Sequence, residues 1–441
     1  MKIGFYGGMA NNMYVFAKAF HAGGVDVSFI RDRSDRYPFS QPVWEDQSFT
    51  MHYEEVPRAS TWSWERWSQL ESEAGWTAPP WMVDPLQPIP LRGEPAGLGA
   101  LSLLDRIWTT RYLREPHRRH ALAAMRACDA LMVCGIEGSI LARFSGKPYI
   151  IWPHGGDLMI AAGMLQPPMR QYRQRIVHGI MARHLQAAFD GAICVGNHEP
   201  SGISSDFWGA EHYIQKLRVV FMPIPIPVRP RPDVAVRRER LAALLREVGM
   251  DTEVSGLTGF VPSRIDYKWK GQDRLLAAVQ MRKSVLREAK AKIIFAGWGE
   301  DLQHARQFAA ENDIADITVF LDVAISKPLL FRFYDCVDFA VDQFTLGMYG
   351  TAALEAMAGG CPLMIWLNDA YERSWGVPPV MNVMTAEQIA HGLESLALGR
   401  YDLVSAGAAL QSWMEKIHGA HRVIPEVMAA FENPGSVSRG W

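Results

Sequence analysis

Two basic side chains lie close together in the carboxy-terminal half of the sequence. Arg264 follows the apolar residues 256–261, and Lys270 with Gly271 opens the next predicted helix. Parallel sheets bind ligands at the carboxyl ends of their strands, so both side chains could point into one crevice. A guanidinium and an ammonium together suit a diphosphate, through bidentate and point-charge contacts respectively. Because a further lysine and two aspartates lie nearby, a solvated basic loop is the alternative.

Glycines follow a second predicted strand in the same half. The apolar residues 292–296 run directly into Gly297 and Gly299. Glycines at such a point let a ligand or another backbone segment approach closely. We therefore place both among the substrate-binding candidates, with an ordinary strand-to-helix turn as the alternative.

The sharpest pattern is the stretch of residues 342–362, which places a glycine-rich turn before a short helix. Gly347 and Gly350 make the turn, and Thr351 caps or begins the helix. The free N–H groups and partial positive charge of a helix start favour an anion. Glu355 lies one turn further on, where a carboxylate can accept hydrogen bonds from both hydroxyls of a ribose. A solvent-facing helical glutamate is the alternative.

The amino-terminal half offers four more candidates. His154 and Asp157 follow the predicted strand 148–152, which places them at the rim of a doubly wound sheet. His154 could donate a hydrogen bond to a transferred sugar, and Asp157 could orient that sugar or contact an acceptor. Gly7 and Gly8 follow the first predicted strand, where backbone N–H groups can face an acceptor or a phosphate. A packed histidine and a purely structural turn are the respective alternatives.

The elements that must position these residues repeat a strand–helix rhythm. Residues 2–6, 12–22 and 26–30 form a βαβ unit, the start of a parallel sheet with helices on its faces. A proline-rich linker begins at residue 223, and a second α/β rhythm follows it. We predict two doubly wound domains, residues 1–222 and 223–418. Residues 419–441 are expected to form a helix or tail that could cross back to the first domain.

A segment rich in tryptophan and proline, about residues 40–118, interrupts the first rhythm. It holds seven of the fifteen tryptophans. We interpret it as an insertion that either packs as a small satellite core or offers an aromatic platform to an acceptor. Aromatic faces suit both uses, including a surface for a lipid-linked acceptor.

Composition narrows the class of protein. The 441 residues carry a formal net charge of −2, so no overall field attracts nucleic acid. Five cysteines without a close pair argue against disulfides and zinc and fit a reducing compartment. We find no secretory signal, no membrane-spanning run and no metal-binding D-x-D motif. We expect a cytoplasmic protein without cofactor or metal, for which a peripheral membrane contact stays open.

Residues 256–365 resemble the nucleotide-binding half of GT-B glycosyltransferases of the family-4, group-1 type. The matching motifs are Arg264 with Lys270-Gly271, Gly297-x-Gly299, and Gly350 through Glu355 to Pro362. Weaker matches in the first half are residues 5–8 and 153–157. The resemblance implies two Rossmann-like domains that face a central cleft. It also implies that the Arg264 and Lys270 positions bind the diphosphate of a sugar nucleotide and that Glu355 binds its ribose.

The sequence departs from this family at one signature position. Gly347 stands where the family has the first of two glutamates, the one that touches the donor sugar or acts near the reaction centre. Asp342, Gln343 or Tyr349 could supply replacement contacts, and spacing alone does not choose among them.

These observations predict a glycosyltransferase that moves a sugar from a nucleoside diphosphate to an acceptor hydroxyl. Arg264 and Lys270 would act with His154 at the reaction centre. The resemblance implies retention of the anomeric configuration, and the Arg–Lys pair could replace a metal. The acceptor could be a sugar, a lipid-linked molecule or another small molecule. A nucleotide-sugar epimerase or phosphorylase, and a non-catalytic nucleotide-sugar-binding protein, are the alternatives.

Overall fold

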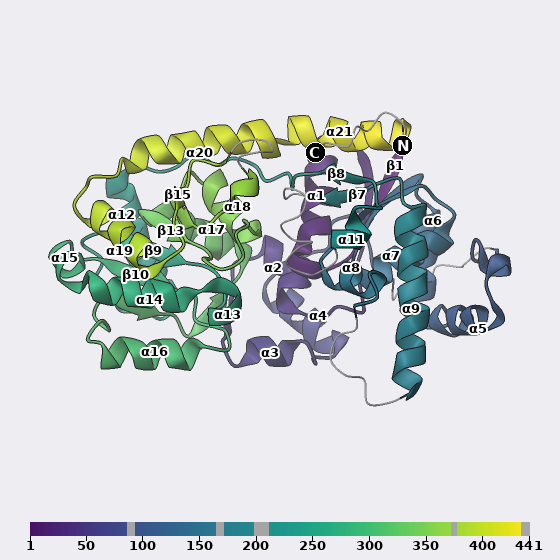
Figure 1. Cartoon of the computed structure of the whole chain (residues 1–441), viewed down its shortest axis with the longest axis horizontal. Coiled ribbons are helices and arrows are strands. Elements are labelled where there is room, and N and C mark those ends of the chain that lie inside the picture. Colours follow the sequence, from purple (N-terminus) through teal and green to yellow (C-terminus); the bar gives the residue numbers. More distant parts are fainter. Residues whose placement is uncertain (86–92, 165–171, 198–210, 372–376, 434–441) are drawn as a thin grey trace. The chain divides into compact units, whose positions relative to one another are not determined.

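The computed structural model describes residues 1–85, 93–164, 172–197, 211–371 and 377–433. Contacts within the chain divide it into two compact units. The first unit comprises Met1–Pro42, Thr77–Pro225 and Ala420–Trp441, and the second comprises Val43–Trp76 and Ile226–Gly419. Figure 1 shows the helices and strands with the labels used below.

The first unit is built on a seven-stranded sheet with the strand order β4-β2-β1-β5-β6-β7-β8. Every neighbouring pair in it is parallel. The central strands β1 and β5 are almost entirely apolar and buried, as expected for a sheet covered on both faces. The strands are β1 (Lys2–Tyr6), β2 (Asp26–Ile30), β4 (Met82–Val83), β5 (Ala130–Cys134), β6 (Tyr149–Trp152), β7 (Val195–Asn197) and β8 (Val219–Phe221).

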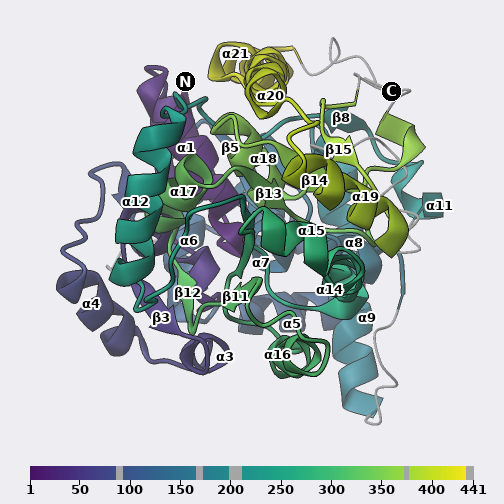
Figure 2. The same ribbon diagram turned by 90° about the vertical axis from the view of Figure 1, so that its left-hand side faces the viewer.

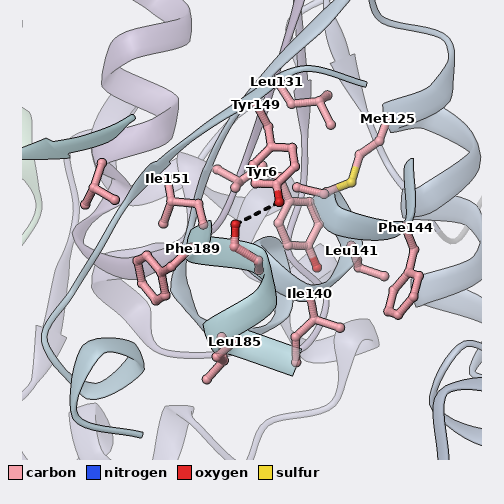
Figure 3. Close-up of a cluster of buried hydrophobic side chains, with 14 of the residues drawn as sticks. Tyr6, Met125, Leu131, Ile140, Leu141, Phe144, Tyr149, Ile151, Leu185 and Phe189 are labelled. Carbon is pink, nitrogen blue, oxygen red and sulfur yellow. Dashed lines mark hydrogen bonds between the residues drawn. The ribbon is translucent and has the colours of Figure 1, made fainter. Parts of the chain in front are cut away.

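Helices cover both faces of this sheet. On one face α6 (Pro116–Arg126), α7 (Gly135–Ser145) and α9 (Tyr172–Gly191) enclose the apolar cluster of Figure 3. Within that cluster the Tyr149 hydroxyl donates a hydrogen bond of 2.7 Å to the carbonyl of Ala188. On the other face α1 (Asn12–Ala22) packs on β1 and β2, and α21 (Ala420–Glu432) packs on α1.

The second unit contains a six-stranded parallel sheet with the order β11-β10-β9-β13-β14-β15. From β9 the chain proceeds outward to β10 and β11, and then returns to β13 on the other side of β9. The boundary between β9 and β13 is therefore the topological switch point of this sheet. The strands are β9 (Thr258–Val261), β10 (Lys292–Phe295), β11 (Thr318–Phe320), β13 (Phe339–Val341), β14 (Leu363–Ile365) and β15 (Met381–Asn382).

Two sets of helices cover this second sheet, as Figure 2 shows. One apolar core lies under α14 (Gln272–Met281), α15 (Lys283–Glu288), α16 (Leu302–Glu311) and α19 (Ala386–Ala397). On the opposite face Phe260 of β9 stacks on Phe333, with ring centroids 4.7 Å apart. The helices on that side are α12 (Val234–Glu247), α17 (Lys327–Cys336), α18 (Thr351–Ala358) and α20 (Leu403–His418).

Part of the tryptophan-rich segment belongs to the second unit. Its strand β3 (Thr50–His52) pairs antiparallel with β12 (Val323–Ile325), and α3 (Glu55–Ala59) and α4 (Trp64–Glu73) follow. Trp44 and Trp67 are fully buried, and none of the seven tryptophans is exposed. This packing favours the satellite-core interpretation over an aromatic platform.

The prediction of an α/β chain with two doubly wound parallel sheets is confirmed. No helix among the described residues is long and apolar enough to cross a membrane. All five cysteines are buried thiols outside any disulfide. The remaining helices and 3₁₀ turns are η1 (Met9–Asn11), η2 (Pro38–Ser40), α2 (Pro42–Asp46), η3 (Leu98–Ala100), α5 (Leu103–Tyr112), α8 (Gly156–Ala161), α11 (Glu211–Ile214), α13 (Tyr267–Lys270) and η4 (Asp369–Tyr371).

Candidate active site

An ion pair occupies the switch point of the second sheet. Lys270 Nζ lies 3.3 Å from Asp342 Oδ1, and the Ser263 hydroxyl donates to the same oxygen at 2.6 Å. Ser263 and Asp342 follow the adjacent strands β9 and β13, so the pair joins the carboxyl ends of both. The side chain of Asp342 is fully buried, whereas that of Lys270 stays 21% exposed. Asp342 thus fixes an ammonium group whose outer side can still meet an anion.

The backbone around Lys270 is tied to the loop that precedes α18. The Phe344 amide donates to the carbonyl of Lys270 at 2.9 Å, and the Thr345 hydroxyl donates to the carbonyl of Trp269 at 2.6 Å. A side chain on Gly271 would meet the methyl group of Thr345 at 2.9 Å. The structure therefore ties Lys270 and its neighbours to the first residues of the loop 342–350, and their shared role toward a diphosphate stays a prediction.

Arg264 is the more exposed of the two cations. Its side chain is 44% exposed, and its guanidinium lies 3.0 Å from Asp266 Oδ2. Asp266 also accepts a hydrogen bond of 3.0 Å from the Trp269 amide and thereby caps α13. Gln272 braces this loop through a 2.8 Å hydrogen bond to the carbonyl of Arg264. The loop is therefore ordered while the arginine head remains accessible.

The glycines after β10 pack backbone against backbone. A side chain on Gly297 would overlap the carbonyl of Leu321, and one on Gly299 would overlap the backbone of Ile265. The Ile265 amide donates to the carbonyl of Trp298 at 2.8 Å. Both glycines thus have a packing role, which is to let the loop after β10 support the loop that carries Arg264. Their contact with substrate stays a prediction.

The loop from Gln343 to Gly350 is ordered by one buried amide side chain. Gln343 Oε1 accepts hydrogen bonds from the amides of Thr345 and Leu346, at 3.0 and 2.7 Å. Its Nε2 donates to the carbonyls of Met348 and Trp366. Gln343 therefore uses its hydrogen-bonding capacity within the protein, and we do not place it against a ligand.

The backbone explains why a glycine replaces the first signature glutamate. Gly347 has φ +69°, a left-handed conformation that disfavours larger residues. A side chain here would also approach the Trp366 ring and the Asn368 Cβ at 3.1 Å. Of the other replacement candidates, Tyr349 is fully buried, with its ring 4.9 Å from that of Tyr371. Asp342, the third candidate, is already engaged in the ion pair with Lys270.

The start of α18 is the open part of this loop. Gly350 is the N-cap residue, and a side chain built on it would meet no atom within 4 Å. Thr351 begins the helix and is only partly buried. The first-turn amides of a helix have no partner within the helix, so this start can receive an anion.

Glu355 is buried and has a cationic partner that the sequence analysis missed. Lys327 Nζ forms a hydrogen-bonded ion pair with Glu355 Oε1, and their side chains are 13% and 3% exposed. Burial raises the pKa of Glu355 above its ordinary value, and the charge of Lys327 opposes this rise. Glu355 Oε2 is buried with no hydrogen-bond partner among the described residues. The interpretation of Glu355 as a solvent-facing residue is therefore wrong.

The position of Lys327 in the sequence could have indicated that it has a carboxylate partner. It is the first residue of α17, where the helix dipole disfavours a cation. Such a lysine needs a compensating partner elsewhere in the fold. The two ion pairs also influence each other, because the negative charge of Asp342 raises the pKa of Glu355.

The remaining candidates belong to the first unit, at the carboxyl ends of its strands. Gly7 follows β1, and a side chain on it would overlap Cys134 at the end of β5. Gly8 lies against Ser40 and Asp35. The strands β1 and β5 are adjacent, and the chain continues from β1 to β2 on one side and from β5 to β6 on the other. These glycines therefore lie at the switch point of the first sheet.

His154 and Asp157 form a compact turn after β6. Asp157 Oδ1 accepts hydrogen bonds from the amides of His154 and Leu158, at 3.0 and 2.9 Å. Burial raises the pKa of Asp157 to about 6 and lowers that of His154 to about 4. The imidazole is therefore neutral at pH 7, and its ring contacts that of Trp152 at 5.6 Å. Asp157 shapes the backbone that presents His154.

Within the described part of the chain, no three His, Cys, Asp or Glu side chains group closely enough to hold a metal ion. Metal independence itself stays a prediction.

Comparison with solved structures finds similar proteins over nearly the whole chain. HepE of Anabaena in complex with UDP-glucose is 13% identical, with a TM-score of 0.58 over 98% of this chain and 100% of its own. Sucrose-phosphate synthase of Thermosynechococcus elongatus is 12% identical, with a TM-score of 0.58 and 98% coverage of each chain. A glycosyltransferase of Rickettsia africae is 11% identical, with a TM-score of 0.52 and 99% coverage of each.

No protein-family model and no curated protein matches the sequence. At such low identity the structural similarity shows the fold alone. The chain has the GT-B fold of these proteins, as the sequence analysis predicted.

Proposed function

We propose that this protein is a glycosyltransferase that moves a sugar from a nucleoside diphosphate to an acceptor hydroxyl. The observation that carries the proposal is the Lys270–Asp342 pair at the switch point, tied to the loop that leads into α18. A cation and a helix start on adjacent loops match the needs of a leaving diphosphate. The GT-B fold, shared with HepE, which was solved with UDP and with UDP-glucose, supports the same function.

In the proposed mechanism, the carboxy-terminal unit binds the nucleotide. Glu355 accepts hydrogen bonds from the ribose through Oε2. Arg264, Lys270 and the amides after Gly350 stabilise the negative charge that builds on the departing diphosphate. One well-placed donor of this kind typically lowers a barrier by roughly 3–4 kcal/mol. These cations would replace a metal, and the resemblance to retaining enzymes supports retention of the anomeric configuration.

The first unit contributes the acceptor side of the proposal. His154 is neutral at pH 7, so it can donate a hydrogen bond to a hydroxyl of the transferred sugar without carrying charge. The acceptor class stays a prediction, and a sugar, a lipid-linked molecule and another small molecule are each compatible with these residues. Gly7 and Gly8 would offer backbone amides to it.

A binding screen tests the donor half of the proposal. Thermal unfolding is measured with UDP, GDP, ADP and their common sugar conjugates, UDP first because HepE was solved with it. A ligand that binds only the folded state raises the unfolding temperature. We expect one nucleoside diphosphate to stabilise the protein and Glu355→Ala to abolish this stabilisation. Absence of stabilisation by every nucleotide would overturn the proposal.

The two alternatives differ in what they do with a bound donor. An epimerase converts the donor without acceptor, and a phosphorylase requires phosphate. A binding protein releases no nucleoside diphosphate with any acceptor. Two quantities measured on the identified donor, release of nucleoside diphosphate and conversion of the donor sugar, separate these functions when each is followed alone, with phosphate and with an acceptor panel.

A further inference from the structure

Helix α5 of the first unit presents an apolar face to solvent. Leu103, Leu104 and Ile107 are 72%, 65% and 57% exposed. Because residues at i, i+1 and i+4 lie on one side of a helix, these three side chains form a single surface, here called the α5 patch. Isolated exposed leucines are common on soluble proteins, but three on one helix face mark an interaction surface.

The opposite face of α5 packs against α9, so the helix that carries the patch is ordered. Trp108 stacks on the ring of His184 of α9 at 5.0 Å, and the Thr109 hydroxyl lies 3.1 Å from the same imidazole. Arg183 of α9 forms a 2.6 Å ion pair with Asp105. Figure 1 shows α5 beside the long helix α9. These contacts order the helix and leave the side chains of the α5 patch exposed to solvent.

The chain segment that carries the patch is rich in exposed arginines. Four exposed arginines lie on α5, on α6 and between them, whereas Glu115 is the single exposed acid between residues 103 and 120. None of the four has a carboxylate partner within the described part of the chain. They are Arg106, Arg111, Arg114 and Arg119. The formal net charge of the whole chain is −2, so this excess is local.

We propose that the α5 patch and its four arginines dock this protein on an anionic lipid surface. Leucine and isoleucine enter the boundary between headgroups and acyl chains, while the exposed arginines of α5, of α6 and of the turn between them pair with anionic headgroups. The charge pattern argues against a second copy, because a symmetric contact would bring the arginines of both copies together without carboxylates. This proposal does not depend on the transferase function.

Sedimentation with vesicles tests the proposal on the full-length protein. The probes are vesicles of phosphatidylcholine alone and of phosphatidylcholine mixed with phosphatidylglycerol. We expect binding to the anionic vesicles only, and weaker binding at high salt. The triple variant Arg111→Gln, Arg114→Gln and Arg119→Gln should bind roughly 100-fold more weakly, since each arginine near the surface contributes.

The apolar half of the surface has a matched control. Leu103→Ser, Leu104→Ser and Ile107→Ser together should weaken vesicle binding at least roughly 10-fold. The control triple Val234→Ser, Val236→Ser and Val404→Ser removes exposed apolar groups of the second unit and should bind as the unmodified protein does. Unchanged thermal unfolding would show that both triples are folded. Equal vesicle binding by the two triples would overturn the proposal.

A site-specific label provides an independent readout. All five native cysteines are buried, so a polarity-sensitive fluorophore attaches selectively to an introduced cysteine. With Ile107→Cys the emission should shift to the blue on addition of anionic vesicles, and with Val404→Cys it should not. A patch that instead mediates self-association would show a blue shift with protein concentration and none with vesicles, which would contradict the lipid proposal.

Discussion

Lys327 forms a partly buried ion pair with one oxygen of Glu355, and the other oxygen has no hydrogen-bond partner among the residues that the structure describes. A buried carboxylate that keeps an unsatisfied oxygen is costly unless a ligand completes its hydrogen bonds. The ion pair therefore has two consequences for a nucleotide: it favours the ionised form of Glu355, and it holds the carboxylate in one orientation.

Replacing Lys327 with methionine should make nucleotide binding sensitive to pH. Without the ammonium, which opposes the effect of burial, the pKa of Glu355 rises further, so the carboxyl becomes protonated at a higher pH than in the unmodified protein. We expect affinity to fall about 10–100-fold as the pH is lowered, with the fall beginning at a higher pH than in the unmodified protein, because hydrogen bonds to a charged group are lost in the neutral form. Calorimetric titration of the best nucleoside diphosphate from pH 5.5 to 8.5 measures this.

The phosphates of the nucleotide also titrate in this pH range, and they do so equally with every variant. Glu355→Gln, which has no carboxyl at this position, is therefore the matched control. It should bind weakly at every pH, and adding Lys327→Met to it should change little further. Identical pH profiles for the unmodified protein and Lys327→Met would show that Lys327 does not influence nucleotide binding. That result would not affect the proposed role of Glu355.

Lys270→Ala and Arg264→Ala should each lower turnover at least about 100-fold, on the scale known for lost charge stabilisation. Lys270→Ala also leaves Asp342 as an unpaired buried carboxylate, so its unfolding temperature should fall, whereas that of Arg264→Ala should not. Rates at saturating donor provide the measurement. Near-normal turnover in both variants would rule out the phosphate role.

Two glycine substitutions separate packing from binding. Gly297→Ala places a methyl group onto the carbonyl of Leu321 and should destabilise the fold by roughly 3 kcal/mol or more. Gly350→Ala meets no atom within 4 Å, so it should cost only about 1 kcal/mol as a poorer N-cap. Its methyl group would instead obstruct the proposed phosphate position. Loss of nucleotide affinity in a folded Gly350→Ala protein is expected, and unchanged affinity would argue against the helix-start site.

His154 should make the folded protein sensitive to acid. Its pKa is about 4 in the folded state and near 6.5 when unfolded, so the unfolded chain binds an additional proton between these values. The stability contributed by neutral His154 is present above pH 6.5 and is lost as the pH falls towards 4, by at most about 3 kcal/mol. The free energy of unfolding of His154→Gln should therefore decline less over this window. The same slope in both proteins would contradict the burial of a neutral imidazole.

The fold was predictable because its elements follow local periodicity. The predicted strand 292–296 corresponds to Lys292–Phe295, and the predicted helix 12–22 is Asn12–Ala22. The predicted helix 272–287 breaks at Arg282, whose φ of −119° is not helical. Apolar spacing continues through that break, so the pattern alone does not reveal it.

The pairing of residues far apart in the chain could not be predicted from the sequence. The three-residue strands β3 and β12 pair across more than 270 residues, and this brings residues 43–76 into the second unit. Similarly, the partners Ser263 and Asp342 lie 79 residues apart, and Lys327 and Glu355 lie 28 apart. The types of these residues are visible in the sequence, but their partners are decided by how strands and helices pack.

The central claim is that Lys270 acts on the diphosphate of the donor. It is tested most directly by comparing the dissociation constants of a nucleoside diphosphate and of its nucleoside, for the unmodified protein and for Lys270→Ala. The account predicts that Lys270→Ala weakens diphosphate binding at least about 10-fold, as expected for a lost charge-assisted hydrogen bond, and leaves nucleoside binding unchanged. Equal weakening of both ligands, or of neither, would contradict it.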